Sequence, residues 1–212
     1  MKSENGRSMV EMLGVLAIIG VLSVGAIAGY SKAMMKYKLN KQAEQLNTVF
    51  NAVDRNLHSF NNLKLESGGH MNITSYFIKM GEIPTEMVKN NNDNIYDTFN
   101  TDIQIRKEYF VYPNGTFNVF AIYLQPELST LSNTNLAICQ NIITIAKEHA
   151  DSLYSLQTFS TEDINTIRAI YLGDNYCNGN NCIRDITLNN MYEICTKHKG
   201  NSNTGFSIAW HV

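Results

Sequence analysis

Residues 12–31 read MLGVLAIIGVLSVGAIAGYS, and this run of 20 residues contains no charged side chain. A helix of that length is about 30 Å long, which matches the hydrocarbon thickness of a bilayer. The run contains Gly14, Gly20, Gly25 and Gly29, and glycine is common in membrane helices because small residues let neighbouring helices approach closely. The sequence therefore predicts a membrane-length helix near the N-terminus.

The composition of the whole chain excludes one class of partner. The 212 residues include 17 Lys and Arg and 19 Asp and Glu, which gives a net charge of -2, and 44% of them are hydrophobic. A near-neutral chain lacks the basic surface that nucleic-acid binding needs, so we predict no nucleic-acid partner. The length is sufficient for one domain with its own core.

Two ordinary interpretations of the apolar run compete with a more specific one. A cleaved signal peptide would have Lys2 and Arg7 in its positive region and would be cut after Ala28. The run is, however, longer than the usual apolar region of about 7 to 15 residues. In a plain membrane anchor, Glu11 would lie at the N-terminal end of the run, and carrying its carboxylate into lipid would cost about 2 to 3 kcal/mol. Glu11 therefore predicts a cationic partner.

The lysines and the cysteines predict opposite orientations in a membrane. Lys32, Lys36, Lys38 and Lys41 follow the run, and the positive-inside rule would place that side in the cytoplasm. The four cysteines also follow the run. An even number of cysteines indicates disulfides and therefore an oxidising compartment outside the cytoplasm.

The residues Gly6-Arg7-Ser8-Met9-Val10-Glu11, followed directly by the apolar run, resemble the processing site of type IV prepilins and the related pseudopilins. The resemblance implies a leader of residues 1–6, removal of this leader by prepilin peptidase after Gly6, and methylation of the new N-terminus at Arg7. It also implies that Glu11, the fifth residue of the mature chain, neutralises the N-terminal amine of a neighbouring subunit in a filament. Arg7 departs from the family, which usually has an apolar or small residue there.

The chain after the run is predicted to continue as an amphipathic helix. No proline occurs before Pro84, and apolar residues recur every three or four positions, which places them on one helix face. We predict one helix from about Val10 to Leu63, ended by Glu66-Ser67-Gly68-Gly69, whose stripe packs on a following sheet in preference to forming a coiled-coil dimer. The stripe consists of Leu39, Ala43, Leu46, Phe50, Val53, Leu57 and Phe60.

The remaining sequence predicts a mixture of helices and strands. Alternating apolar and polar residues predict strands at 102–106, 108–112 and 117–124, joined as a hairpin through a turn at 112–116. Helices are predicted at 76–80, from an Asn133 cap to His149 with Leu136 and Cys139 facing inward, and at 188–197, before a closing strand at 206–210. We therefore predict an α+β fold in which a long N-terminal helix packs on an antiparallel sheet.

This order of elements also resembles the globular domain of type IVb pilins. The likeness is carried by Gly81 to Pro84, by residues 99–105 and 117–124, and by Cys139. Type IVb leaders are usually longer than six residues, so the chain mixes features of the two pilin classes. Taken together, the two resemblances imply a leader at 1–6, a transmembrane and filament-core half of the first helix at 7–31, an amphipathic half at 32–65, and a globular pilin head at 66–212.

Cys139, Cys177, Cys182 and Cys195 allow three disulfide connectivities. Cys177 and Cys182 flank a flexible turn, Asn178-Gly179-Asn180-Asn181, that can bring them together and would leave Cys139 for Cys195. The resemblance implies the same second bridge, because in the family a disulfide ties this helix to the C-terminal region. A zinc site made of Cys177, Cys182, Cys195 and His198 is the alternative, although these residues lack the usual zinc spacing.

No motif for catalysis occurs in the chain. A Gly-rich phosphate loop, an HExxH sequence and a GxSxG sequence are all absent, and His58, His70, His149, His198 and His211 are dispersed. We therefore predict that the protein is not an enzyme, with no catalytic residue, no metal and no cofactor.

The resemblance implies a structural subunit, major or minor, of a type IV pilus. Its expected partners are further copies of itself, other pilins, prepilin peptidase, an inner-membrane assembly platform, and membrane lipid before assembly. The expected location is the bacterial inner membrane, with a single span and the C-terminal part outside the cytoplasm, and then the extracellular pilus. The alternatives are a pseudopilin of a type II secretion system and a secreted binding protein with a signal peptide cut after Ala28. A role in adhesion, motility, secretion or DNA uptake stays open.

Overall fold

The computed structural model describes residues 9–60, 62–63, 65, 69–89, 93–112, 115–126, 132–160, 167–179, 181–196 and 204–211. The predicted leader and the cleavage site at Gly6 and Arg7 lie outside these residues. The chain forms two compact units, of which the first ends at Lys38 and the second begins at Leu39.

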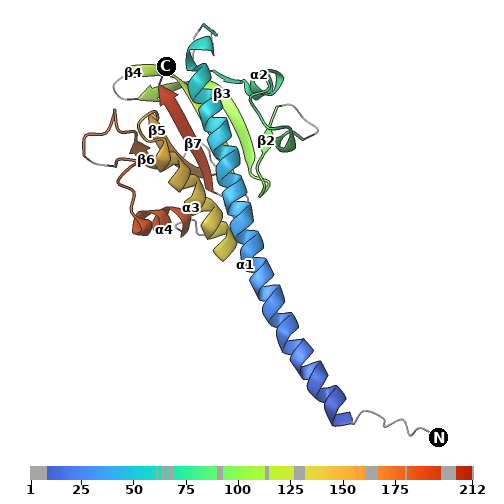
Figure 1. Ribbon diagram of the computed structural model, residues 1–212. Coiled ribbons are helices and arrows are strands. Elements are labelled where there is room, and N and C mark those ends of the chain that lie inside the picture. The colour runs from blue at the N-terminus through green and yellow to red at the C-terminus, as the bar shows by residue number, and fades with distance from the viewer. Residues whose placement is uncertain are drawn as a thin grey trace, which may run out of the picture. The chain divides into compact units, whose positions relative to one another are not determined.

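The elements follow the α+β order that the sequence predicts (Figure 1). The helices are α1 (Met9–Asn56), α2 (Thr74–Lys79), α3 (Asn133–Glu148) and α4 (Leu188–Thr196), and two short 3-10 turns are η1 (Leu57–Phe60) and η2 (Thr85–Met87). The strands are β1 (His70–Asn72), β2 (Ile95–Tyr96), β3 (Asp102–Tyr112), β4 (Gly115–Gln125), β5 (Ser155–Ser160), β6 (Ile167–Leu172) and β7 (Thr204–His211).

The long N-terminal helix is confirmed, but its end differs from the prediction of Leu63. The α-helix ends at Asn56, and the 3-10 turn η1 follows it from Leu57 to Phe60. A buried lysine lies at this end: Lys107 Nζ donates to the carbonyl oxygens of Phe60 at 2.9 Å and of Leu63 at 2.8 Å. Carbonyls at a helix end have no partner within the helix, and here the ammonium group of Lys107 supplies one. Burial lowers the pKa of Lys107.

The strands described above form one antiparallel sheet in the order β1-β3-β4-β7-β5-β6, with β2 pairing with β3 as well. The predicted strands 102–106 and 108–112 are a single strand, β3, which pairs with β4 from Asp102 opposite Gln125 to Tyr112 opposite Gly115. The predicted hairpin and the closing strand are therefore confirmed. The strands β5 and β6 were not predicted, although β5 pairs with both β6 and β7.

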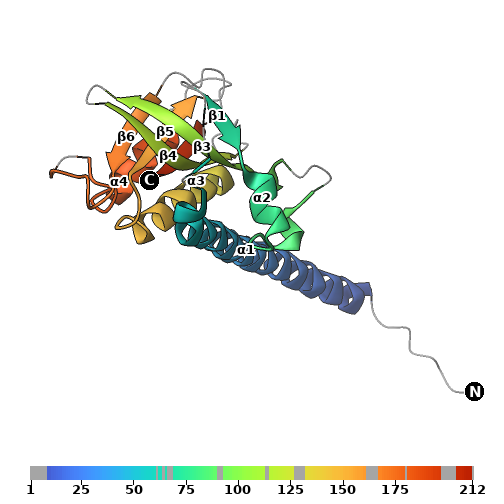
Figure 2. The same cartoon turned by 90° about the horizontal axis from the view of Figure 1, so that it is seen from above.

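The hydrophobic core of the second unit lies between the sheet and two helices. The part of α1 from Leu39 onward and α3 cover the same face of the sheet, as the two views show (Figures 1 and 2). Phe50 of α1 packs edge to face on Trp210 of β7, with ring centroids 5.5 Å apart, and both side chains are fully buried. His149 Nε2 and Asn47 Oδ1, 2.8 Å apart, connect α3 to α1. The predicted stripe of α1 therefore packs on the sheet.

The start of α3 corrects two details of the prediction. The cap is Ser132 and not Asn133, because the Ser132 side chain accepts a hydrogen bond from the backbone N–H of Asn135 at 3.1 Å. A serine hydroxyl at this position satisfies one of the free N–H groups of the first turn. Leu136 is half-buried, whereas Ile138 is buried together with Cys139.

Candidate functional site

Glu11 lies in the first turn of α1. It is exposed to solvent, and it is the one charged residue between Met9 and Ser31. A carboxylate at a helix N-terminus is stabilised by the partial positive charge of the free N–H groups there. Its chain neighbours Val10 and Met12 are nonetheless apolar and exposed, so Glu11 is an acid within a surface that favours an apolar environment. Such an acid is stable away from water only beside a cation.

The first half of α1 exposes large apolar side chains on every side. The exposed fractions are 84% at Met9, 74% at Val10 and Val21 and 67% at Ile27. Contiguous apolar surface of this extent is unusual for a soluble monomer and indicates contact with lipid or with another protein. In the part of the chain that the structure describes, α1 is the one helix that is long and apolar enough to span a membrane.

The glycines of this segment are not required by packing inside the chain. A Cβ atom at Gly14, Gly20, Gly25 or Gly29 would meet no atom within 4 Å other than those of its chain neighbours and of the surrounding helix backbone. Gly25 and Gly29 are four residues apart, which is the spacing through which two helices approach closely in membranes. These positions therefore suit a contact with a second helix.

Comparison with known proteins assigns no family to the chain. No family model, curated protein or solved structure matches it. Among the described residues, no group of three or more His, Cys, Asp or Glu side chains is placed to hold a metal ion.

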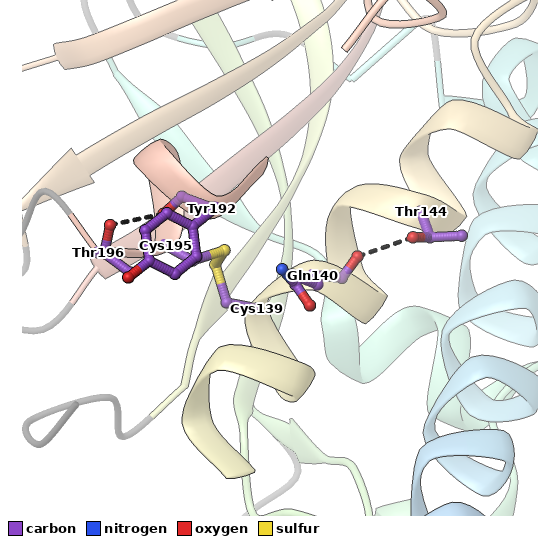
Figure 3. Close-up of a disulfide and its surroundings, with 6 residues drawn as sticks. All are labelled: Cys139, Gln140, Thr144, Tyr192, Cys195 and Thr196. Carbon is purple, nitrogen blue, oxygen red and sulfur yellow. Dashed lines mark hydrogen bonds between the residues drawn. A yellow bond between two sulfur atoms is a disulfide. The ribbon is translucent and has the colours of Figure 1, made fainter. Parts of the chain in front are cut away.

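Both predicted cysteine pairs are at disulfide distance. Cys139 of α3 is joined to Cys195 of α4, with their Cα atoms 5.8 Å apart, and Cys177 is joined to Cys182, with Cα atoms 5.4 Å apart. Figure 3 shows the first bridge, together with hydrogen bonds from Thr144 to Gln140 and from Thr196 to Tyr192 within the two helices. Cys177, Cys182 and Cys195, the three cysteines of the alternative zinc site, are all in disulfides, and His198 lies outside the described residues.

A buried carboxylate that the sequence did not single out holds α1 to the segment before β3. Asp97 accepts a hydrogen bond on Oδ2 from Gln42 Nε2 at 2.6 Å. Its other oxygen accepts from the backbone N–H groups of Phe99 and Thr101, each at 2.8 Å. Asp97 and Gln42 are 6% and 0% exposed, and a buried carboxylate is tolerated where hydrogen bonds replace its water.

One helical turn later, Gln45 makes the next contact with the same segment. Its Nε2 donates to Glu86 Oε1 at 3.0 Å, and its Oε1 accepts from the backbone N–H of Thr98 at 2.9 Å. Hydrogen bonds from Lys41 and Gln45 lower the pKa of the Glu86 carboxyl. The two glutamines, three residues apart beside the apolar stripe, are the sequence signal that could have indicated this contact. Their role is to fix α1 within the second unit.

The face of the sheet opposite α1 and α3 has a polar group of its own. Tyr123 Oη donates to Glu108 Oε2 at 2.7 Å, and the Arg106 guanidinium lies 4.5 Å from the centre of the Tyr123 ring. Burial raises the pKa of the Tyr123 hydroxyl, and the nearby charge of Glu108 raises it further. Arg106 Nε also donates to Gln104 Oε1 at 2.9 Å, and the Tyr123 ring lies against Phe159 of β5 with centroids 5.7 Å apart. We therefore assign this group a role in stabilising the sheet.

Proposed function

We propose that the chain is a pilin-like structural subunit, held in the bacterial inner membrane by the first half of α1 and then assembled through that half into a filament. The observation that carries the proposal is the difference in exposure between the two halves of α1. Its first half is apolar and exposed on all sides, whereas its second half is a core helix of a disulfide-braced α+β unit. Cleavage after Ala28 would discard most of the exposed apolar half, so the continuity of α1 favours this proposal over a secreted binding protein.

Glu11 would set the register between neighbouring subunits. Inside a bundle of apolar helices, a carboxylate and an ammonium group are each costly alone, and removing one member of such a pair costs about 3 to 5 kcal/mol. If prepilin peptidase cuts after Gly6, the new amine of Arg7 is a cation that a neighbouring copy can place beside Glu11. Neighbouring helices then associate at the axial offset that brings this amine to Glu11, and Gly25 and Gly29 allow their backbones to approach.

The N-terminus of the mature protein tests the proposal most directly. Mass spectrometry of protein purified from membranes should find a chain that begins at Arg7 and carries an N-methyl group. A mature chain that begins at Gly29 would overturn the proposal and support a secreted protein. Imaging of surface filaments in cells with and without the protein separates a pilus subunit from a pseudopilin, since loss of secretion with unchanged filaments would indicate a pseudopilin.

Replacement of Glu11 tests the pairing. Glu11→Ala should leave the protein in the membrane but lower its incorporation into filaments at least tenfold, because each 1.4 kcal/mol lost at a contact lowers its equilibrium constant tenfold. Glu44→Ala is the control, since Glu44 is an exposed acid of the same helix that pairs with Lys41 at 3.3 Å. Normal filaments from Glu11→Ala would contradict the pairing role.

A further inference from the structure

A group of basic and aromatic side chains begins at the C-terminal end of the apolar run and has no part in the assembly proposed above. We name Tyr30, Lys32, Lys36, Tyr37 and Lys38 the basic collar. All five side chains are exposed, with exposed fractions of 66% at Tyr30 and 63% at Tyr37. They lie on α1 within the first compact unit.

The basic collar surrounds the helix and does not present a single face. With 3.6 residues per turn, Lys32 and Lys36 share one side of α1, the two tyrosines share a second side, and Lys38 lies on a third. A protein partner would engage one side, whereas lipid surrounds a membrane helix on all sides. From Tyr30 to Lys38 the helix rises by about 12 Å, which is enough to cross the headgroup layer of one leaflet, about 5 to 8 Å thick.

The three lysines of the collar have no acidic residue nearby along the helix. No Asp or Glu occurs between Met12 and Ala43, so no carboxylate of α1 lies within one turn of Lys32, Lys36 or Lys38. Lys41 differs, because its ammonium group pairs with Glu86 at 2.9 Å and Glu44 at 3.3 Å. The positive charge of the collar is therefore suited to anions outside the chain.

We propose that the basic collar binds the anionic headgroups of phospholipids at the membrane surface from which residue 39 and the following chain emerge. Tyrosine rings are favoured at the membrane interface, where one end of the ring is apolar and the other is hydrated. Lysine ammonium groups beside them can reach lipid phosphates, and each contributes to attraction by an anionic surface. The inference rests on the proposed function, because it requires the first half of α1 to lie in a bilayer.

This binding also accounts for the conflict between the lysines and the cysteines. The positive-inside rule concerns which flank stays in the cytoplasm during insertion. Lysines that bind headgroups of the outer leaflet have a role on the extracytoplasmic side. The disulfide-bonded unit and the basic collar can then occupy the same side of the membrane.

The test measures lipid selectivity around the full chain. The protein is reconstituted in vesicles of equal parts phosphatidylcholine and phosphatidylglycerol, and spin-labelled forms of each lipid report which one is motionally restricted at the protein. One lysine near the surface corresponds to about a fivefold change in association. We expect phosphatidylglycerol to be preferred by about fivefold at each headgroup contact, and this preference to weaken in 1 M salt, where the screening length is about 3 Å.

Three variants assign the preference to the basic collar. The triple variant Lys32→Gln/Lys36→Gln/Lys38→Gln should have nearly equal association with the two lipids. The matched triple variant Lys32→Arg/Lys36→Arg/Lys38→Arg keeps the charge and should keep the preference. Lys79→Gln removes an exposed lysine of α2 and should change nothing.

Four results would overturn the inference. They are an inserted wild-type chain without preference, a Gln triple variant that keeps the preference, loss of the preference in the Arg triple variant, and a preference that disappears when the protein is diluted with excess lipid. The last result would assign the lysines to acidic groups of a neighbouring copy. A chain that alkaline washing strips from the vesicles would overturn this inference together with the membrane step of the proposed function, whereas the first four results leave that step intact.

Discussion

The two disulfides close loops of very different length, and their removal should therefore destabilise the second unit by different amounts. The bridge between Cys139 and Cys195 spans a sequence separation of 56, and the bridge between Cys177 and Cys182 spans a separation of 5. A cross-link restricts the unfolded chain by an entropy that grows with the logarithm of the loop length, which gives about 4 kcal/mol for the long loop and about 2 kcal/mol for the short one. Because Cys139 is fully buried, its truncation to alanine adds about 1 kcal/mol of lost packing.

The assay is equilibrium unfolding in urea of the full chain in detergent, followed by fluorescence. Trp210 is a convenient reporter, since it is the single tryptophan and is fully buried against Phe50. With a denaturant dependence of about 2 kcal/mol per molar, the midpoint should fall by about 2.5 M in Cys139→Ala/Cys195→Ala and by about 1 M in the matched Cys177/Cys182 variant. Equal shifts, or a larger shift for the short loop, would refute the loop-entropy reasoning.

Three further substitutions test the second unit. Gly173→Ala should lower the free energy of unfolding by about 3 kcal/mol, because the added Cβ would lie 1.8 Å from the carbonyl oxygen of Leu153. Gly81→Ala, which meets open space at a φ of 73°, should cost about 1 kcal/mol, and equal losses in thermal unfolding would contradict the clash. Tyr123→Phe removes the hydrogen bond to Glu108 and should cost about 1 kcal/mol at neutral pH. The raised pKa of Tyr123 means that above pH 10 the unfolded chain releases a proton that the folded chain keeps, so stability falls as pH rises. This alkaline fall should be smaller in Tyr123→Phe, and an unchanged pH profile would count against the assignment.

The elements that the sequence predicted are those whose periodicity reflects burial on one face. Leu46, Phe50 and Val53 of α1 recur at helical spacing because one side of the helix faces the sheet. In the β3–β4 hairpin, Ile103 and Ile105 of β3 lie opposite Leu124 and Ile122 of β4, and all four are fully buried. Local pattern and final packing agree in both places.

The strand β5 was missed because its buried positions include polar residues. Its sequence is SLQTFS, in which Ser155, Gln157 and Thr158 are nearly as buried as Leu156. The strand lies between β7 and β6, and the register of its pairing with β6 shifts between Thr158 and Phe159. The usual alternation of apolar and polar residues therefore does not appear. Burial of polar residues depends on the tertiary structure and leaves no mark on the local pattern.

The residues of the candidate site likewise include some that the local sequence identifies and some that it does not. Glu11 and the cysteine pairs could be identified because a lone acid beside an apolar run and a short loop between two cysteines are local features. The contact between Gln42 and Asp97 joins residues 55 positions apart. The glutamines beside the apolar stripe indicate a polar contact of α1, but no feature of the sequence around Asp97 identifies it as the partner. The proposed cation for Glu11 belongs to a second copy of the chain, so its identification requires the assembled filament.

The position of β7 in the sheet has a consequence for the order of folding. β7 lies between β4 and β5, and it follows every other described strand in the chain. During synthesis, the β3–β4 and β5–β6 hairpins are complete before residues 204–211 emerge, but isolated hairpins are marginally stable in water. The sheet can therefore close only after synthesis reaches its last strand. A chain that is exported as it is made would remain unfolded during transit and would fold after delivery.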